Sequence, residues 1–119
     1  MHFCADQRLR RQLDFQRIRT EGRRFDCGSF VLQHVRREPE HAVEPARLGV
    51  VASIAAVGNA IQRARAKRRL REVFRRHQEL VPPGHDLLLV ARRALNRLEF
   101  RELERKFTDA CRHVFPPAP

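Results

Sequence analysis

The sequence predicts a single-domain α+β fold, a two-layer sandwich with its elements in the order helix, strand, strand, helix, strand, helix (α-β-β-α-β-α). Three observations predict this. The chain has 119 residues, about the size of one domain. Its hydrophobic fraction of 42% is enough for a compact core. Alternating and helical apolar patterns follow one another along it, as in a sheet covered by helices. We expect one domain over residues 1–119, ordered over about 8–114, with a frayed Pro-rich end over 116–119.

The first predicted element is a short helix. Asp14 has the side chain of a good N-cap, and the helix then runs through Phe15 and Ile18. Gly22 is placed to end it, because glycine commonly terminates helices.

Two strands follow this helix. Residues 29–35 (SFVLQHV) alternate between two faces and are enriched in β-branched and aromatic residues, which is typical of a strand. Residues 36–46 carry two prolines and three glutamates, and therefore predict a solvated connection. Residues 47–54 (RLGVVASI) are more apolar, which predicts a second and more buried strand.

The clearest element is a long helix. Gly58 and Asn59 interrupt the chain, and Asn59 with Gln62 forms an Asn-x-x-Gln version of the capping box. From there residues 60–80 can continue as one helix until residues 82–84 (PPG) stop it. At 100° per residue, one stripe of this helix is apolar. The stripe contains Ala66, Leu70, Val73 and Phe74.

The chain closes with a strand and a further amphipathic helix. Residues 86–91 (DLLLVA) predict a short buried strand. Asn96 and Glu99 are spaced to start the helix, in which an apolar seam faces the core. The seam contains Phe100, Leu103, Phe107, Cys111 and Val114.

The charge of the chain predicts a polyanionic partner. Lys and Arg number 25 against 14 Asp and Glu, a net of +11, and all these cations except Lys67 and Lys106 are arginine. Residues 63–76 alone hold eight cations and one anion, Glu72, so one helix carries most of the excess charge. Ordinary surface helices mix signs, because like charges at i,i+4 repel. Guanidinium groups bind phosphate in a planar, bidentate way, which favours phosphate binding over a plain solvated face.

Composition and motifs argue against other classes of function. No apolar run approaches the length of a membrane span, and the N-terminus has no apolar segment of a secretory signal. A membrane-surface helix would need Leu70, Val73 and Phe74 free to leave the protein, whereas we expect them to cover the sheet. The serines and threonines lie in no nucleophile motif, and the six histidines show no metal-ligand spacing. We therefore expect neither a protein-borne active site nor a zinc site.

We expect structural roles for the cysteines and for His34. Cys4, Cys27 and Cys111 are an odd number at wide spacing, which indicates reduced thiols in a cytoplasm rather than a disulfide framework. His34 shares a strand face with two apolar residues, so we expect a hydrogen-bonded core residue.

Residues 47–76 (RLGVVAS…VGNAIQRARAKRRLREVFRR) resemble the signature of the protein subunit of bacterial ribonuclease P. That signature is a strand ending in V-x-S, then V-G-N-A-V, then an Arg-Asn-Arg-x-[Lys/Arg]-Arg helix that continues L-x-R-E-x-F. The likeness extends in order over residues 8 to about 113: RLRRQLDFQRIRTEG is similar to the family's first helix, GSFVLQHV to its first strand and HDLLLVARR to its last. Two places depart from the family. Ala64 replaces the asparagine of Arg-Asn-Arg, and residues 54–56 (IAA) stand where the family has a basic pair.

This resemblance implies a left-handed βαβ crossover around the arginine-rich helix, where handedness rules alone favour a right-handed one. It implies the protein component of a ribonucleoprotein endonuclease that removes the 5′ leader from precursor tRNA. In that enzyme the catalytic RNA holds the Mg²⁺ ions and performs the hydrolysis, while the protein binds this RNA and the leader. The implied partners are ribonuclease P RNA and precursor tRNA, in the cytoplasm, with no membrane and no obligate protein partner. The alternative is a non-catalytic RNA-binding or ribosome-associated module of similar fold.

The resemblance also assigns candidate site residues. The residues expected to contact the catalytic RNA lie on the arginine-rich helix, and they are Arg63, Arg65, Lys67, Arg68, Arg69, Arg71 and Arg75. The residues expected to line a cleft for the leader, between the sheet and the first helix, are Phe15, Arg19, Val31 and Gln33, the last two because they lie on one face of the strand over 29–35. Phe15 matches an aromatic of the family and either stacks on a base or packs in the core. Arg19 stands where many members have a second aromatic, and it can stack or pair with phosphate. No catalytic residue and no metal ligand is assigned to the protein.

Overall fold

A four-stranded sheet lies at the centre of the computed structural model, which describes residues 7–116. The helices are α1 (Gln12–Glu21), α2 (Ala60–His77) and α3 (Phe100–Val114). The strands are β1 (Arg23–Asp26), β2 (Phe30–Arg36), β3 (Arg47–Val51) and β4 (His85–Ala91). The 3₁₀ turns are η2 (Pro39–His41), η3 (Gln78–Leu80) and η4 (Arg93–Arg97). None of the described helices is long and apolar enough to span a membrane.

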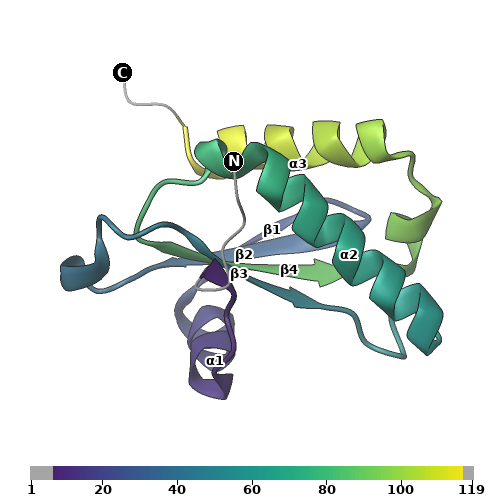
Figure 1. Cartoon of the computed structure of the whole chain (residues 1–119), viewed down its shortest axis with the longest axis horizontal. Helices are drawn as coiled ribbons and strands as arrows, with labels where there is room; N and C mark the ends of the chain where they lie inside the picture. Colours follow the sequence, from purple (N-terminus) through teal and green to yellow (C-terminus); the bar gives the residue numbers. More distant parts are fainter. Residues whose placement is uncertain (1–6, 117–119) are drawn as a thin grey trace.

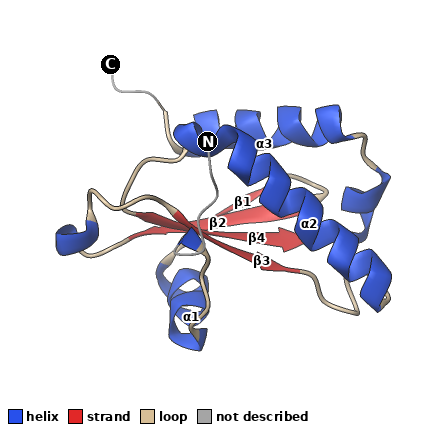
Figure 2. Ribbon diagram, in the orientation of Figure 1, coloured by secondary structure: helices blue, strands red, loops and turns tan. Residues whose placement is uncertain are grey.

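The helices cover the sheet unequally. α2 and α3 pack together on one face, while α1 crosses part of the other (Figures 1 and 2). The α+β class and the predicted order of elements are therefore confirmed, with α1 as a partial cover on the second face. The Pro-rich end predicted to fray lies outside the described residues except for Pro116, and so does Cys4.

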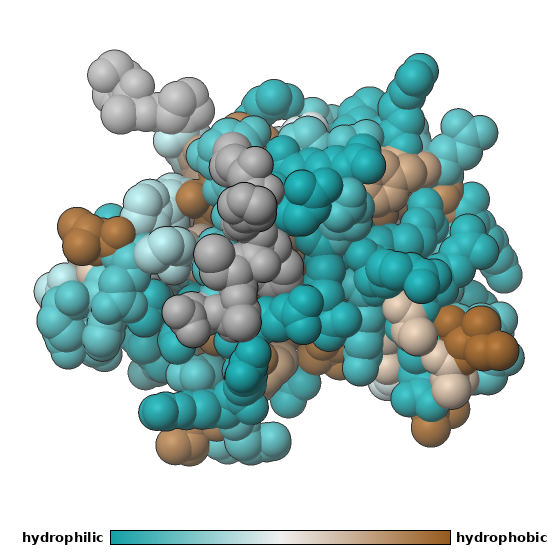
Figure 3. Space-filling view, viewed as in Figure 1, coloured by the Kyte–Doolittle hydropathy of each residue, from teal (hydrophilic) through white to brown (hydrophobic). Residues whose placement is uncertain are grey.

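The main core lies between the sheet and the pair α2 and α3. The predicted stripe of α2 is fully buried there, and it consists of Ala66, Leu70, Val73 and Phe74. The sheet and α3 supply further fully buried side chains, among them Phe30, Leu32, Leu87, Leu89, Leu103 and Phe107. Each such side chain contributes about 1.5–3 kcal/mol through removal from water. The outer surface on this side is mostly hydrophilic, as Figure 3 shows.

A smaller core lies beneath α1. Leu9, Ile18 and Leu88 are buried in it, and Phe15 packs against them from α1. Because α1 covers only part of this face, the remaining sheet surface is open to a ligand.

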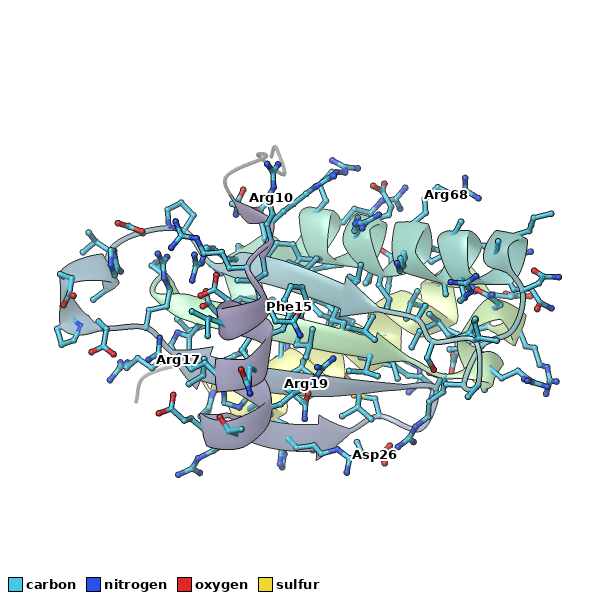
Figure 4. The ribbon with its side chains drawn as sticks, turned by 90° about the horizontal axis from the view of Figure 1, so that it is seen from below. Arg10, Phe15, Arg17, Arg19, Asp26 and Arg68 are labelled. Carbon is cyan, nitrogen blue, oxygen red and sulfur yellow. The ribbon has the colours of Figure 1, made fainter. Side chains whose placement is uncertain are left out.

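The connection from β3 to β4 is left-handed, as predicted. The strands lie in the order β1-β2-β4-β3, with β3 parallel to β4 and the other pairs antiparallel. Figure 4 views the sheet from the α1 side, with β3 above β4 and both strands running from left to right. α2 joins them from behind the sheet. This crossover places α2 along the β3 edge, with its outer side in solvent.

The start of α2 confirms the predicted capping box. The Asn59 side chain accepts from the Gln62 amide and the Gln62 side chain accepts from the Asn59 amide, both at 2.9 Å. Gly58 precedes them with φ +129°, and a Cβ there would lie 2.0 Å from Gln62 Oε1. Glycine is therefore required at this entry to the helix.

The structure corrects the predicted start of α1. The helix begins at Gln12 with Arg11 at the N-cap, so Asp14 lies in its first turn. The Asp14 carboxylate lies 3.6 Å from the Arg47 guanidinium, which is a partner from the sheet that local sequence cannot reveal. Gly22 ends the helix as predicted.

One strand and several boundaries also differ from prediction. α2 ends at His77, and residues 78–80 form η3 instead of continuing the predicted helix. β1 was not predicted, because its sequence RRFD is polar and it lies exposed at the sheet edge. β3 stops at Val51 rather than residue 54, since Ser53 Oγ accepts from the Ala56 amide at 3.1 Å and closes a turn. α3 starts at Phe100 with Glu99 rather than Asn96 at its N-cap.

Candidate nucleic-acid interface

Two arginines of α2 extend into solvent as unpaired cations. Arg65 and Arg68 are exposed, lie three residues apart and form no ion pair among residues 7–116. Figure 4 shows Arg68 pointing away from the sheet. Lys67 is half-buried beside them and likewise has no ion pair in this part of the chain. These side chains can donate hydrogen bonds to phosphate without first breaking an internal pair.

Farther along α2, Glu72 neutralises part of the arginine charge. Arg75 donates to both Glu72 carboxylate oxygens at 2.8 Å, and Arg76 donates to one of them at 2.9 Å. The hydrogen bond from Arg75, followed by that from Arg76, lowers the pKa of Glu72 to about 2 despite some opposing desolvation. The candidate RNA contact Arg75 is thus already paired within the protein.

Arg69 is also engaged inside the molecule. Its guanidinium donates to the backbone carbonyls of Leu95 and Leu98. Burial, followed by repulsion from Arg65, lowers the pKa of Arg69. This candidate RNA contact therefore holds η4 against α2. Its position in the sequence did not indicate this structural role.

Arg63 and Arg71 flank the exposed pair. Arg63 is half-buried, and its Nε donates to the Gly58 carbonyl at 3.2 Å. Arg71 is half-buried, and desolvation followed by repulsion from Arg8 lowers its pKa. Arg8 therefore extends the positive potential of α2 toward the segment before α1.

The two departures from the family signature meet at the start of α2. Ala64 is exposed, and so is Ile54, which keeps 69% of its surface in the loop before α2. Ile61 keeps 81% of its surface on the first turn of the helix. An apolar spot at this end of α2 is visible in Figure 3. The basic helix therefore begins with an uncharged tip.

A shallow hollow on the α1 side brings together three of the four predicted leader residues. It measures about 350 Å³ and is lined by Arg19, Arg24, Val31, Gln33 and Val90. Figure 4 shows Arg19 directed from α1 over the open sheet. Arg19 and Arg24 are exposed and make no ion pair in the described chain. The hollow thus combines two available cations, one amide and an apolar floor.

Sequence reasoning missed Arg24 and Val90 in this hollow. Arg24 lies opposite Gln33, and Val90 opposite Val31, in the registers of β2 with its neighbours. After Asp86, residues 87–91 are continuously apolar, so their sequence does not indicate which face Val90 occupies, and Arg24 required recognition of the polar strand β1.

Phe15 lies beside the hollow rather than in its lining. Its ring packs over Gly49, where an added Cβ would come within 2.7 Å of Phe15 Cε1. Phe15 remains half-buried in the small core with Ile18 and Leu88. Most of the Phe15 surface is buried by packing in this core, and the rest is exposed to solvent.

Two of the hydroxyl groups expected to be inert are held by local backbone contacts. Thr20 donates to the Gln16 carbonyl at 3.0 Å, and Thr108 donates to the Arg105 carbonyl at 3.1 Å. The Ser29 side chain is buried. None of these hydroxyls is hydrogen-bonded to a histidine or carboxylate.

Cys27, Cys111 and His34 are neutral near pH 7. Cys27 and Cys111 are free thiols, and burial raises their pKa values to about 11 and about 12. His34 is half-buried, with its ring 4.9 Å from that of Phe115, and burial lowers its pKa. Cys111 is buried in the core as expected. His34 differs from the expected hydrogen-bonded core residue, because it lies half-buried against the rings of His85 and Phe115.

Comparisons with known proteins agree with this geometry. The model of the Ribonuclease P family matches residues 3–114. Over 116 residues the chain is 28% identical to the ribonuclease P protein component of Thermotoga maritima, covering 94% of this chain and 95% of that protein. It is 38% identical over 89 residues to the component of Oleidesulfovibrio alaskensis, covering 75% of this chain and 69% of that protein.

Solved structures show the same fold. The RNase P protein of Staphylococcus aureus superposes with a TM-score of 0.76 at 25% identity, covering 91% of this chain and 94% of that one. The protein of Thermotoga maritima superposes with a TM-score of 0.76 at 28% identity, covering 89% and 96%. The chain therefore belongs to the ribonuclease P protein family.

Proposed function

We propose that this ribonuclease P protein component acts by electrostatic binding of RNA, and that the catalytic RNA carries out the cleavage. The observation that carries the proposal is the pair Arg65 and Arg68, exposed on α2 and without ion pairs in the described chain. Each guanidinium can neutralise one phosphate and release its counterions. With Lys67, they form the surface that we assign to the catalytic RNA.

The hollow on the α1 side is proposed to bind the 5′ leader of precursor tRNA. Arg19 and Arg24 would pair with leader phosphates, and Gln33 would donate to or accept from a base. In the part of the chain that the structure describes, no aromatic side chain lines this hollow, so most of the binding energy would come from phosphate rather than from base stacking. The leader would accordingly be bound with little dependence on its sequence.

The hydrolysis itself is assigned to the RNA partner. Among the described residues, no group of three or more His, Cys, Asp or Glu could hold a metal ion. We therefore assign the Mg²⁺ ions to the RNA and give no protein residue a part in the cleavage of the phosphodiester bond. The protein's residues bind, orient and shield charge. We further propose a cytoplasmic particle that needs no other protein.

Reconstitution tests this function. The chain is mixed with a bacterial ribonuclease P RNA and a precursor tRNA, and leader cleavage is followed at low Mg²⁺. We expect the chain to accelerate cleavage over the RNA alone. An unchanged rate would favour the alternative of an RNA-binding module outside this enzyme.

Leader recognition is tested with two tRNA forms. Arg19→Ala/Arg24→Ala should reduce the preference of the holoenzyme for precursor over mature tRNA, while binding of the catalytic RNA stays unchanged. Arg105→Ala is the control, since Arg105 is also exposed but paired with Glu102 and, at 3.8 Å, with Asp109. If both variants reduce the preference for precursor tRNA equally, the leader does not bind in this hollow.

A further inference from the structure

A second group of exposed arginines lies where η4 meets α3. Arg93, Arg97 and Arg101 are all exposed, and none forms an ion pair among residues 7–116. Glu99 is the one acidic residue between positions 92 and 101. This junction is thus strongly positive and outside the surface assigned so far.

The junction is held against α2 by specific contacts. Arg69 donates to the carbonyls of Leu95 and Leu98, and the Asn96 side chain donates to the Gln62 carbonyl at 2.9 Å. Leu95 is fully buried. The position of the junction relative to the basic helix is therefore fixed before any ligand binds.

Neighbouring arginines, by contrast, form ion pairs. Arg92, just before η4, donates to both Asp26 oxygens at 2.8 Å. Arg105, one turn beyond Arg101 on α3, pairs with Glu102. The cations on either side of the junction thus have carboxylate partners, whereas those of the junction are left available.

We propose that Arg93, Arg97 and Arg101 form a second phosphate-binding site for the RNA that binds α2. The inference rests on the proposed function, because it takes the catalytic RNA as the ligand. That RNA then contacts two elements of fixed separation, the outer side of α2 and the η4–α3 junction. Such a two-point contact fixes the orientation of the RNA on the protein, which one row of cations on a single helix cannot do.

The salt dependence of RNA binding tests the second site. Arg93→Ala/Arg97→Ala should lower the slope of log K against log[NaCl] by about 1.4–1.8, from about 0.7–0.9 per phosphate contact. The single variant Arg97→Ala should lower it by about half of that. Arg105→Ala, which removes one paired arginine from the same region, should leave the slope near that of the unaltered chain. Equal slopes for Arg97→Ala and Arg105→Ala would overturn the proposal.

Hydroxyl-radical footprinting of the catalytic RNA supplies an independent readout. Nucleotides that lose protection in Arg93→Ala/Arg97→Ala should stay protected in Arg65→Ala/Arg68→Ala. Nucleotides that lose protection in Arg65→Ala/Arg68→Ala should in turn stay protected in Arg93→Ala/Arg97→Ala. If the same nucleotides lose protection in both double variants, the two groups of arginines do not bind separate parts of the RNA. If the unaltered chain does not bind the RNA, the proposed function itself fails. If only the Arg65→Ala/Arg68→Ala variant changes slope and footprint, the second site alone fails.

Discussion

Removing the two unpaired arginines of α2 gives the sharpest prediction about RNA binding. In Arg65→Ala/Arg68→Ala, both lost guanidiniums are exposed and have no ion pair within the described chain. Alanine is a strong helix former, and neither side chain contributes to the core, so the fold should remain intact. The variant therefore changes the charge presented to RNA and little else.

The magnitude follows from counterion release. Two phosphate contacts at about 0.7–0.9 each predict a salt slope lower by about 1.4–1.8. Between 50 and 200 mM NaCl, this difference changes the affinity ratio of unaltered chain to variant by about 7- to 12-fold. The deficit of the variant is largest at low salt.

The assay is a titration of labelled catalytic RNA at four salt concentrations. Thermal unfolding of both proteins confirms that they are equally folded. Arg105→Ala serves as the control, because it removes one exposed but paired cation. If the double variant keeps the slope of the unaltered chain while its affinity falls uniformly, Arg65 and Arg68 do not contact phosphate and the interface lies elsewhere.

Other predictions concern the charges that are paired. Glu72→Gln removes the carboxylate shared by Arg75 and Arg76, so RNA binding should strengthen and its salt slope should steepen, as filter binding can measure. Because the folded pKa of Glu72, about 2, is below its ordinary 4.5, its stabilisation is present above pH 4.5 and lost as pH falls toward 2. Urea unfolding should show a larger loss of stability between pH 4.5 and 2 in the unaltered chain than in Glu72→Gln, where only the other paired carboxylates titrate. Asp86→Asn should destabilise the fold by about 3 kcal/mol in urea, because it removes the carboxylate that the partly buried Arg47 binds at 2.7 and 2.9 Å and leaves it only the Asp14 carboxylate at 3.6 Å. A loss below about 1 kcal/mol would contradict this reasoning.

Local signals predicted the arginine-rich helix well. Asn59 and Gln62 form their capping box from residues three positions apart, and the buried stripe repeats at helical spacing. Such features depend on nearest neighbours along the chain, so the sequence contains them directly. The partnership of Glu72 with Arg75 and Arg76, at i,i+3 and i,i+4, was equally available and was overlooked.

Contacts between distant segments could not be predicted in this way. Arg69 was assigned to RNA contact from the family resemblance, yet it bonds carbonyls 26 and 29 residues away. Asp14 has the chemistry of an N-cap, yet it faces Arg47 from β3. In both cases a tertiary partner outcompeted the local role.

The hollow on the α1 side illustrates an intermediate case. Arg19 was assigned from the family resemblance and Val31 and Gln33 from their shared strand face, and the fold brings all three together. Arg24 was absent from that set because β1 is too polar to be recognised as a strand. Its cationic lining emerges only when the edge strand is paired with β2.

The central claim is that the protein supplies charge and binding while RNA supplies the chemistry. A Mg²⁺ titration of leader cleavage tests it most directly, with the catalytic RNA alone, with the unaltered chain and with Arg65→Ala/Arg68→Ala. The account predicts that high Mg²⁺ restores cleavage by the RNA alone and by the variant complex toward that of the unaltered complex. Cleavage that depends on the unaltered chain at every Mg²⁺ concentration would contradict the account, because it would require a chemical group from the protein.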